Sequence, residues 1–162
     1  MAKIALGTWA WGAGAFGGDT VFGSKTDVEN LKPVFDTAMK AGLSLWDTAT
    51  AYGMGESERI LGQLAGAYSR ADVQISTKFT PQIAEVFENS VEKMADASIV
   101  RMGCDYIDVY WIHNEHRDRF LFHYIRYIIL FPIPVNLSNC RKEAFLLFNS
   151  TNIDFFISVG NC

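Results

Sequence analysis

Basic residues, paired cysteines and long hydrophobic runs are all scarce in this chain of 162 residues. It carries 14 lysines and arginines against 18 aspartates and glutamates, for a formal net charge of −4 at pH 7. This balance argues against a basic face for nucleic acid or for an anionic membrane. Small soluble molecules are therefore the expected partners.

The three cysteines, Cys104, Cys140 and Cys162, form neither a CxxC pair nor a metal-ligand spacing. The sequence thus predicts no disulfide framework and no bound metal, which fits a reducing compartment. The first residues, MAKIALG, lack the apolar core of a signal peptide and the Arg- and Ser-rich composition of a transit sequence. We expect a cytoplasmic protein.

One apolar run, FLFHYIRYIILF at residues 120–131, includes Arg126 and is followed by Pro132. A transmembrane helix needs about 20 predominantly apolar residues, and this run is shorter. We therefore predict no membrane span and interpret the run as a helix or strand that packs on the rest of the chain.

The first two thirds of the chain alternate short apolar segments with helical patterns. The expected strands are residues 4–6, 43–46, 73–77 and 106–112. Helices are predicted at 30–39 and 56–68, and helical composition extends from Pro81 to Met102. Such alternation is typical of a parallel sheet built from βα units. A complete TIM barrel uses about 250 residues, so we predict an α/β fold truncated to about four βα units, an open half-barrel.

The first predicted helix illustrates the pattern. Its apolar residues follow the i, i+3, i+4 spacing of one helix face and comprise Leu31, Val34, Phe35, Ala38 and Met39. Pro33 is expected in its first turn, where a missing N–H costs little, and Gly42 is the expected stop signal.

A glycine run precedes this helix. Gly12, Gly14 and Gly17 satisfy GxGxxG, and Asp36 follows about 20 residues later, as in dinucleotide-binding folds. In those folds the glycines open directly into a helix whose N-terminus holds the pyrophosphate, whereas GGDTVFGSKTD follows here and is predicted to be a loop. We favour a glycine-rich βα loop over a Rossmann motif.

The composition changes beyond Asn114. Only one of the 13 glycines, Gly160, lies there, whereas phenylalanines become frequent. We therefore divide the chain into an α/β region at residues 1–114 and an atypical apolar tail at residues 115–162, with a further strand predicted at residues 153–159.

Four polar residues, Asp47, Tyr52, Lys78 and His113, lie at or just after the carboxyl ends of predicted strands. Taken singly, each is better explained without a function: as a cap, a loop aromatic, a solvated strand end and a satisfied strand terminus, in that order. Taken together, they can donate a proton, because a phenol with a pKa of about 10 becomes a useful acid when a cation favours its ionised form. A lysine supplies that cation, a carboxylate holds the lysine, and a histidine can hold a substrate oxygen. Such a set suits a carbonyl oxygen that gains negative charge on receiving hydride.

Short motifs across residues 1–114 resemble those of the aldo/keto reductase superfamily, in the same order. They are Gly7-Thr8-Trp9, Asp47-Thr48-Ala49 with Tyr52-Gly53, Gly55-Glu56-Ser57-Glu58, Ser76-Thr77-Lys78, and Ile107-Asp108-Val109-Tyr110 with His113. The resemblance implies a (β/α) TIM-barrel-type fold and NADPH-dependent reduction of a small carbonyl substrate.

The same resemblance implies roles for individual residues. Tyr52 would be the general acid, with Lys78 and Asp47 assisting the release of its proton and His113 orienting the carbonyl. Cofactor contacts near the nicotinamide would come from Gly7, Thr8, Trp9 and Asp47. Substrate contacts would come from Trp11, Tyr52 and His113.

The resemblance covers the N-terminal half of the family's barrel. Family members have four more βα units, which hold the nicotinamide amide and the 2′-phosphate of NADPH, and no such pattern is recognisable in residues 115–162. Two hypotheses follow: an NADPH-dependent carbonyl reductase, or a non-catalytic fragment that acts as an interaction partner. In either case an exposed apolar edge on the fourth strand would favour self-association.

Overall fold

The computed structural model describes residues 4–24, 26–84, 90–113, 142–148 and 153–159, the last two segments by their backbone only. The strands are β1 (Ala5–Gly7), β2 (Leu45–Asp47), β3 (Gln74–Phe79), β4 (Val109–Ile112), β5 (Lys142–Phe148) and β6 (Ile153–Val159). The α-helices are α1 (Gly18–Phe22), α2 (Val28–Lys40), α3 (Glu56–Ala65) and α4 (Ser90–Met102). Short 3₁₀ turns are η1 (Tyr52–Gly55), η2 (Arg70–Asp72) and η3 (Pro81–Ile83).

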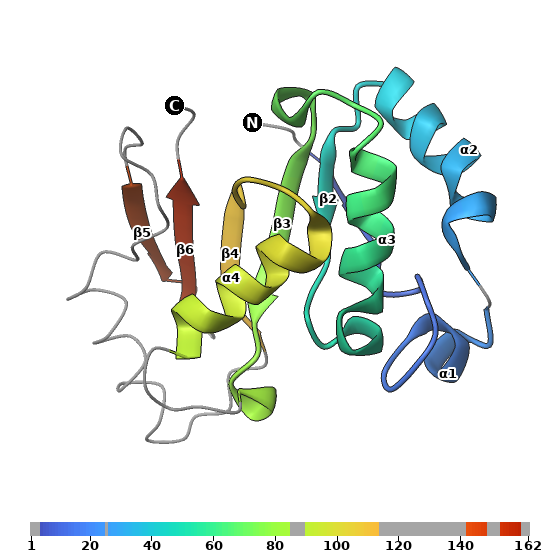
Figure 1. The fold of residues 1–162 in the computed structure, drawn as a ribbon. Coiled ribbons are helices and arrows are strands. Elements are labelled where there is room, and N and C mark those ends of the chain that lie inside the picture. The colour runs from blue at the N-terminus through green and yellow to red at the C-terminus, as the bar shows by residue number, and fades with distance from the viewer. Residues whose placement is uncertain (1–3, 25, 85–89, 114–141, 149–152, 160–162) are drawn as a thin grey trace.

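The strands form one open sheet in the order β1-β2-β3-β4-β6-β5. The first four are parallel and follow chain order, and α2, α3 and α4 lie along one face of them (Figure 1). The predicted parallel α/β fold with four βα-type strands is confirmed. Each predicted strand among residues 1–113 overlaps an observed one, although the observed strands are displaced or shortened by one to three residues.

The outer edge of β4 differs from the prediction. β6 pairs antiparallel with β4, with Val109 opposite Ser158 and Tyr110 opposite Ile157. The prediction of an exposed β4 edge for self-association is therefore wrong, because the correctly predicted strand at residues 153–159 occupies that place. β5, which the sequence pattern did not predict, pairs antiparallel with β6. The run at residues 120–131 lies outside the described residues.

Helix α2 begins earlier than its apolar pattern indicated. The Asp27 carboxylate accepts a hydrogen bond from the Asn30 backbone N–H, and the Asn30 side chain accepts one from the Asp27 backbone N–H. This reciprocal capping box starts the helix at Val28. The placement of Pro33 in the first turn is consequently wrong: Pro33 lies in the helix interior, where proline removes an i→i−4 hydrogen bond.

The segment after the glycine run was predicted to be a loop, but it contains the one-turn helix α1. Gly23, with a φ of 69°, ends this helix in the left-handed conformation that glycine tolerates. Residues 8–17 separate β1 from α1. The glycines therefore do not connect a strand directly to a helix, as a dinucleotide-binding turn requires.

The hydrophobic core lies between the sheet and the helices. Trp46, Ile75 and Phe79 are each at most 2% exposed, and the rings of Phe35 and Trp46 stack with centroids 4.4 Å apart. Because strand side chains alternate between faces, β3 directs Ile75, Thr77 and Phe79 toward the helices and Ser76 and Lys78 to the opposite face. The sheet thus has one face for packing and one that can carry chemistry.

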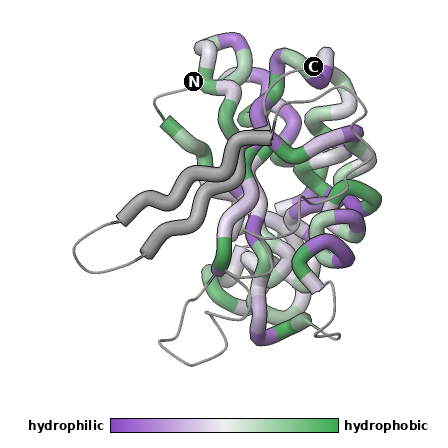
Figure 2. The backbone as a smooth tube through the Cα atoms, turned by 90° about the vertical axis from the view of Figure 1, so that its left-hand side faces the viewer, coloured by the Kyte–Doolittle hydropathy of each residue, from purple (hydrophilic) through white to green (hydrophobic). Residues whose placement is uncertain are grey.

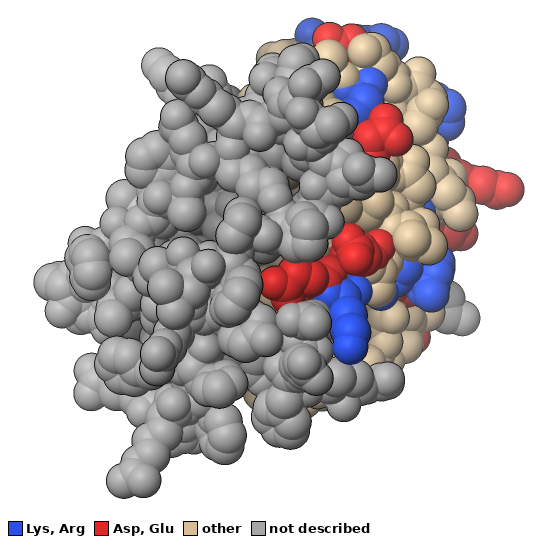
Figure 3. All heavy atoms as spheres, turned by 60° about the vertical axis from the view of Figure 1, so that its left-hand side comes forward, with Lys and Arg blue, Asp and Glu red and all other residues tan. Residues whose placement is uncertain are grey.

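Hydrophobic and hydrophilic residues are interspersed along the helices (Figure 2), as expected where only one helix face meets the core. Where side chains are described on the face shown in Figure 3, acidic and basic groups lie next to one another. Within the described part of the chain, no helix combines the length and apolar composition needed to cross a bilayer.

Candidate active site

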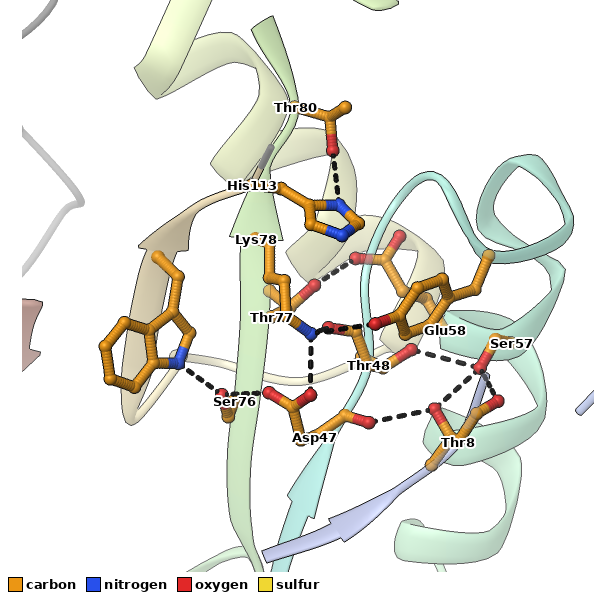
Figure 4. A network of polar contacts seen from close by, with 12 residues as sticks. Thr8, Asp47, Thr48, Ser57, Glu58, Ser76, Thr77, Lys78, Thr80 and His113 are labelled. Atoms are coloured by element: carbon orange, nitrogen blue, oxygen red, sulfur yellow. Dashed lines mark hydrogen bonds and ion pairs between the residues drawn. The ribbon is translucent and has the colours of Figure 1, made fainter. Parts of the chain in front are cut away.

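The four predicted polar residues converge at the carboxyl ends of β2, β3 and β4 (Figure 4). Lys78 Nζ lies 2.6 Å from Asp47 Oδ2 and 3.3 Å from the Tyr52 hydroxyl. The rings of Tyr52 and His113 are perpendicular, with centroids 5.7 Å apart. The expected convergence of these side chains is confirmed.

Strand register explains this convergence. Asp47 on β2 is opposite Ser76 on β3, and Lys78 on β3 is opposite Trp111 on β4. Directly opposed residues of neighbouring strands share a face, as do residues two apart on one strand. Asp47, Ser76, Lys78 and Trp111 therefore lie on the face opposite the helices. His113 follows β4 directly, and its backbone N–H donates to the Phe79 carbonyl.

The Lys78 ammonium has an acceptor for each of its three N–H groups. They are Asp47 Oδ2 at 2.6 Å, the Thr48 carbonyl at 2.7 Å and the Tyr52 hydroxyl oxygen at 3.3 Å. An ammonium can only donate, so the Tyr52 oxygen is the acceptor in that contact. The hydroxyl proton of Tyr52 must then point away from Lys78, and it is available to another acceptor.

The turn that carries Tyr52 is tightly constrained. Gly53, Met54 and Gly55 have φ values of 59°, 51° and 92°, so three successive residues adopt left-handed conformations. Met54 is the costly member, because its Cβ disfavours this region. The ring of Trp9, which is 44% exposed, stacks on the Tyr52 ring with centroids 5.8 Å apart. Tyr52 is thus held from its backbone and from one ring face.

The surroundings of His113 favour its neutral form. Burial lowers its pKa below the usual value, and the positive charge of Lys78 lowers it further, while the Asp47 carboxylate opposes the shift. Its Nδ1 lies 3.2 Å from the Thr80 hydroxyl, on the side away from Lys78 (Figure 4). A neutral imidazole held at Nδ1 leaves Nε2 for a further hydrogen bond.

The residues predicted to contact a cofactor lie in different environments. Gly7 is exposed, with open space where a Cβ would be, and Trp9 is exposed beside Tyr52. Thr8 is fully buried, and its hydroxyl bonds to Ser57 Oγ at 2.7 Å and the Asp47 carbonyl at 3.2 Å. Thr8 therefore supports the end of β2 from behind, while Gly7 and Trp9 face open space.

The structure does not bring Trp11 to the cluster. Its side chain is 6% exposed and packs in the core, with its ring centroid 5.4 Å from that of Trp46. Its core position could not be predicted, because a tryptophan after a short strand suits either a pocket wall or a core. The structure does not support a substrate-contact role for Trp11.

A second polar cluster, which sequence reasoning missed, lies on the helix side of β3. The Glu58 carboxylate is fully buried and accepts hydrogen bonds from Arg101 Nε at 2.6 Å and from the Thr77 hydroxyl at 2.7 Å. Arg101 also donates to the hydroxyls of Thr50 and Ser98. This cluster ties Thr77, next to Lys78, and Thr50, which precedes Tyr52 by two residues, to α3 and α4. One sequence signal could have indicated that Glu58 is buried: it lies one helical turn before Leu61, on the apolar face of α3.

Two further observations concern metal binding and the nearest cavity. Among the described residues, no three histidine, cysteine, aspartate or glutamate side chains lie close enough together to hold a metal ion. A cavity of about 390 Å³ opens between η1 and α4, where Thr50, Met54 and Arg101 are among its lining residues. The four converging residues do not line it, so the candidate site is the opposite face of the sheet.

Comparisons with known proteins agree with the geometry. The sequence model of the aldo/keto reductase family matches residues 3–125. The chain is similar to the aldo-keto reductase YhdN of Bacillus subtilis (strain 168), 33% identical over 118 residues, covering 68% of this chain and 34% of that protein. It is also similar to the aldo-keto reductase yakc [NADP(+)] of Schizosaccharomyces pombe, 30% identical over 114 residues, covering 65% and 33%.

Among solved structures, the holo form of aldo-keto reductase AKR11C1 from Bacillus halodurans superposes with a TM-score of 0.59 and 22% identity, covering 76% of this chain and 40% of that one. This likeness shows a shared fold. The chain spans about a third of the length of the curated relatives it matches. The family match extends past the predicted boundary at residue 114, so that division stays a prediction.

Proposed function

The chain belongs to the aldo/keto reductase family, and from this membership and the site geometry we propose that it serves NADPH-dependent reduction of a small carbonyl compound, with Tyr52 as the proton donor. The observation that carries the proposal is the hydrogen bonding of Lys78, whose three N–H groups all have acceptors and one of which faces the Tyr52 oxygen. This arrangement leaves the phenolic proton for the substrate.

The residues of the chain supply proton transfer and orientation. As a carbonyl becomes an alcohol, its oxygen gains negative charge and takes the hydroxyl proton of Tyr52. The Lys78 ammonium beside the phenol stabilises the phenolate that remains. Asp47 holds Lys78 in place, and neutral His113 can donate through Nε2 to the same substrate oxygen. The charge that develops is thereby shared between two donors.

NADPH would supply the hydride to the carbonyl carbon. The residues present fit the reacting end of such a cofactor, because Gly7, with open space where a Cβ would be, lies opposite Asp47 in the β1–β2 register, and the exposed ring of Trp9 stacks on Tyr52. Asp47, whose side chain is 26% exposed, borders the same space. Thr8 contributes only indirectly, through its bonds behind Asp47. The relative in Schizosaccharomyces pombe, whose name includes NADP(+), supports the choice of cofactor.

The decisive test is a titration of the full chain with NADPH followed by fluorescence, combined with a carbonyl reduction assay. We expect saturable binding, and we expect Tyr52→Phe to abolish reduction while leaving NADPH affinity nearly unchanged, because the hydroxyl acts on the substrate oxygen. Reduction by Tyr52→Phe at the unmodified rate would remove Tyr52 as the acid.

The second hypothesis, a non-catalytic interaction partner, stays a prediction. The chain spans about a third of the length of its curated relatives. The residues that bind the cofactor phosphates in the family have no recognisable match in this sequence. Absence of NADPH binding at high concentration would favour this hypothesis. The cytoplasmic location also stays a prediction.

A further inference from the structure

The Asp47 carboxylate has a separate partner on each oxygen. Oδ2 accepts from Lys78 Nζ at 2.6 Å, and Oδ1 accepts from the Ser76 hydroxyl at 2.7 Å. Ser76 is 3% exposed and lies directly opposite Asp47 in the β2–β3 register. The carboxylate is therefore fixed at both oxygens from one strand, β3.

A third residue fixes the direction of this contact. Trp111 Nε1 lies 2.8 Å from the Ser76 hydroxyl oxygen (Figure 4 shows the bond to Ser76). An indole N–H can only donate, and an ionised carboxylate can only accept. The single hydroxyl proton of Ser76 must then point to Asp47, so the chain runs from Trp111 through Ser76 to Asp47 without an alternative arrangement.

We propose that Ser76 and Trp111 are positioning residues that orient the Asp47 carboxylate toward Lys78, an inference that rests on the proposed reductase function. With Oδ1 held by Ser76, the carboxylate plane cannot turn freely, and Oδ2 stays directed at the ammonium. Lys78 in turn keeps its third N–H on the Tyr52 oxygen. Neither Ser76 nor Trp111 is among the four residues assigned to proton transfer, and both act through Asp47.

The test compares Ser76→Ala with Ser76→Thr in the full chain. Hydrogen bonds to charged groups contribute enough that losing one lowers a rate by roughly 10- to 100-fold. We expect Ser76→Ala to lower kcat by about that factor with little change in KM or NADPH affinity, because the change affects proton transfer and not binding. Ser76→Thr keeps the hydroxyl and suits a β-strand, and it should restore most of kcat.

Trp111→Phe provides the second arm. Alone it should lower kcat less than Ser76→Ala, since the hydroxyl can still reach Asp47 but is free to rotate. Added to Ser76→Ala it should lower kcat by much less than it does alone, because the positioning contact proposed for Trp111 runs through the Ser76 hydroxyl. Ser44→Ala, at the opposite end of the sheet from the cluster, is the matched control and should behave as the unmodified chain. Independent, multiplicative losses from the two variants, or no rescue by threonine at equal thermal stability, would overturn the proposal.

A measurement without turnover separates this proposal from the proposed function. A lysine ammonium held by three acceptors gives an observable NMR signal, whereas one that exchanges rapidly with water does not. The Lys78 signal should be present in the unmodified chain and in Ser76→Thr, and weakened in Ser76→Ala. If the unmodified chain reduces no carbonyl, the proposed reductase function is refuted, but the positioning role of Ser76 is not. An identical Lys78 signal in all variants refutes the positioning role.

Discussion

Loss of Arg101 should reveal how strongly the buried cluster around Glu58 supports the fold. Replacing Arg101 by methionine keeps the apolar stem of the side chain but leaves the Glu58 carboxylate, which is fully buried, without its cation. Breaking a buried ion pair by removing one partner costs about 3–5 kcal/mol, because an uncompensated charge remains. The Arg101 side chain is 18% exposed, so some water can reach the vacated place.

We therefore expect a loss near the lower end of that range, about 3 kcal/mol of unfolding free energy. For a chain of this size, such a loss lowers Tm by roughly 6–12 °C. Glu58→Gln should cost less, about 1–2 kcal/mol, since the amide can still accept from the Thr77 hydroxyl and Arg101 can turn toward water. The double variant should be more stable than Arg101→Met alone, because it contains no orphaned charge.

Urea unfolding followed by circular dichroism measures these differences. The matched control is Arg59→Met, which removes an arginine from an ion pair with Glu56 whose side chains are 50% and 42% exposed. Such surface pairs contribute about 0–1 kcal/mol. If Arg101→Met and Arg59→Met lower the free energy of unfolding equally, the buried Glu58 cluster does not stabilise the fold as proposed.

Three further predictions concern the site itself. Lys78→Met removes a positive charge that lowers the pKa of His113. NMR titration of the His113 ring should therefore show a higher pKa in this variant, and an unchanged or lower pKa would contradict the arrangement. Because the folded pKa of His113 is lowered, unfolded chains bind more protons than folded ones between that pKa and about 6.5. Stability should therefore rise with pH across this window, and His113→Gln should flatten the rise in unfolding measurements at several pH values. Met54→Gly should stabilise the protein by up to about 1 kcal/mol, because glycine adopts the left-handed backbone conformation of Met54 without a Cβ penalty. Met54→Val should destabilise the protein. A higher Tm for the valine variant than for the glycine variant would contradict this.

The convergence of the four candidate residues could be predicted from the sequence because it follows from few rules. Asp47, Lys78 and His113 each end or follow a strand in the same sense, and parallel strands place such positions on one edge. Tyr52 follows β2 by five residues, short enough to stay near that edge. Local periodicity and strand direction were sufficient, and no knowledge of packing was needed.

Features that depend on distant partners were not predictable in this way. Glu58 and Arg101 are 43 residues apart, and nothing in either local pattern identifies the other. Trp11 was assigned to the substrate pocket by the family resemblance, and nothing in its local pattern identifies its core contact with Trp46. The start of α2 was missed for a different reason: Asp27 and Asn30 carried the capping signal, but the apolar spacing that begins at Leu31 was given more weight.

The alternation along β3 links folding and chemistry. Ile75, Thr77 and Phe79 lie on the packed face, and Ser76 and Lys78 lie on the face of the candidate site, so these five residues alternate between the two sides of the sheet. A slip of one residue in pairing would bury Lys78 in the core and expose Phe79. Misaligned molecules would thus lose the packed core and the contact between Lys78 and Asp47 together.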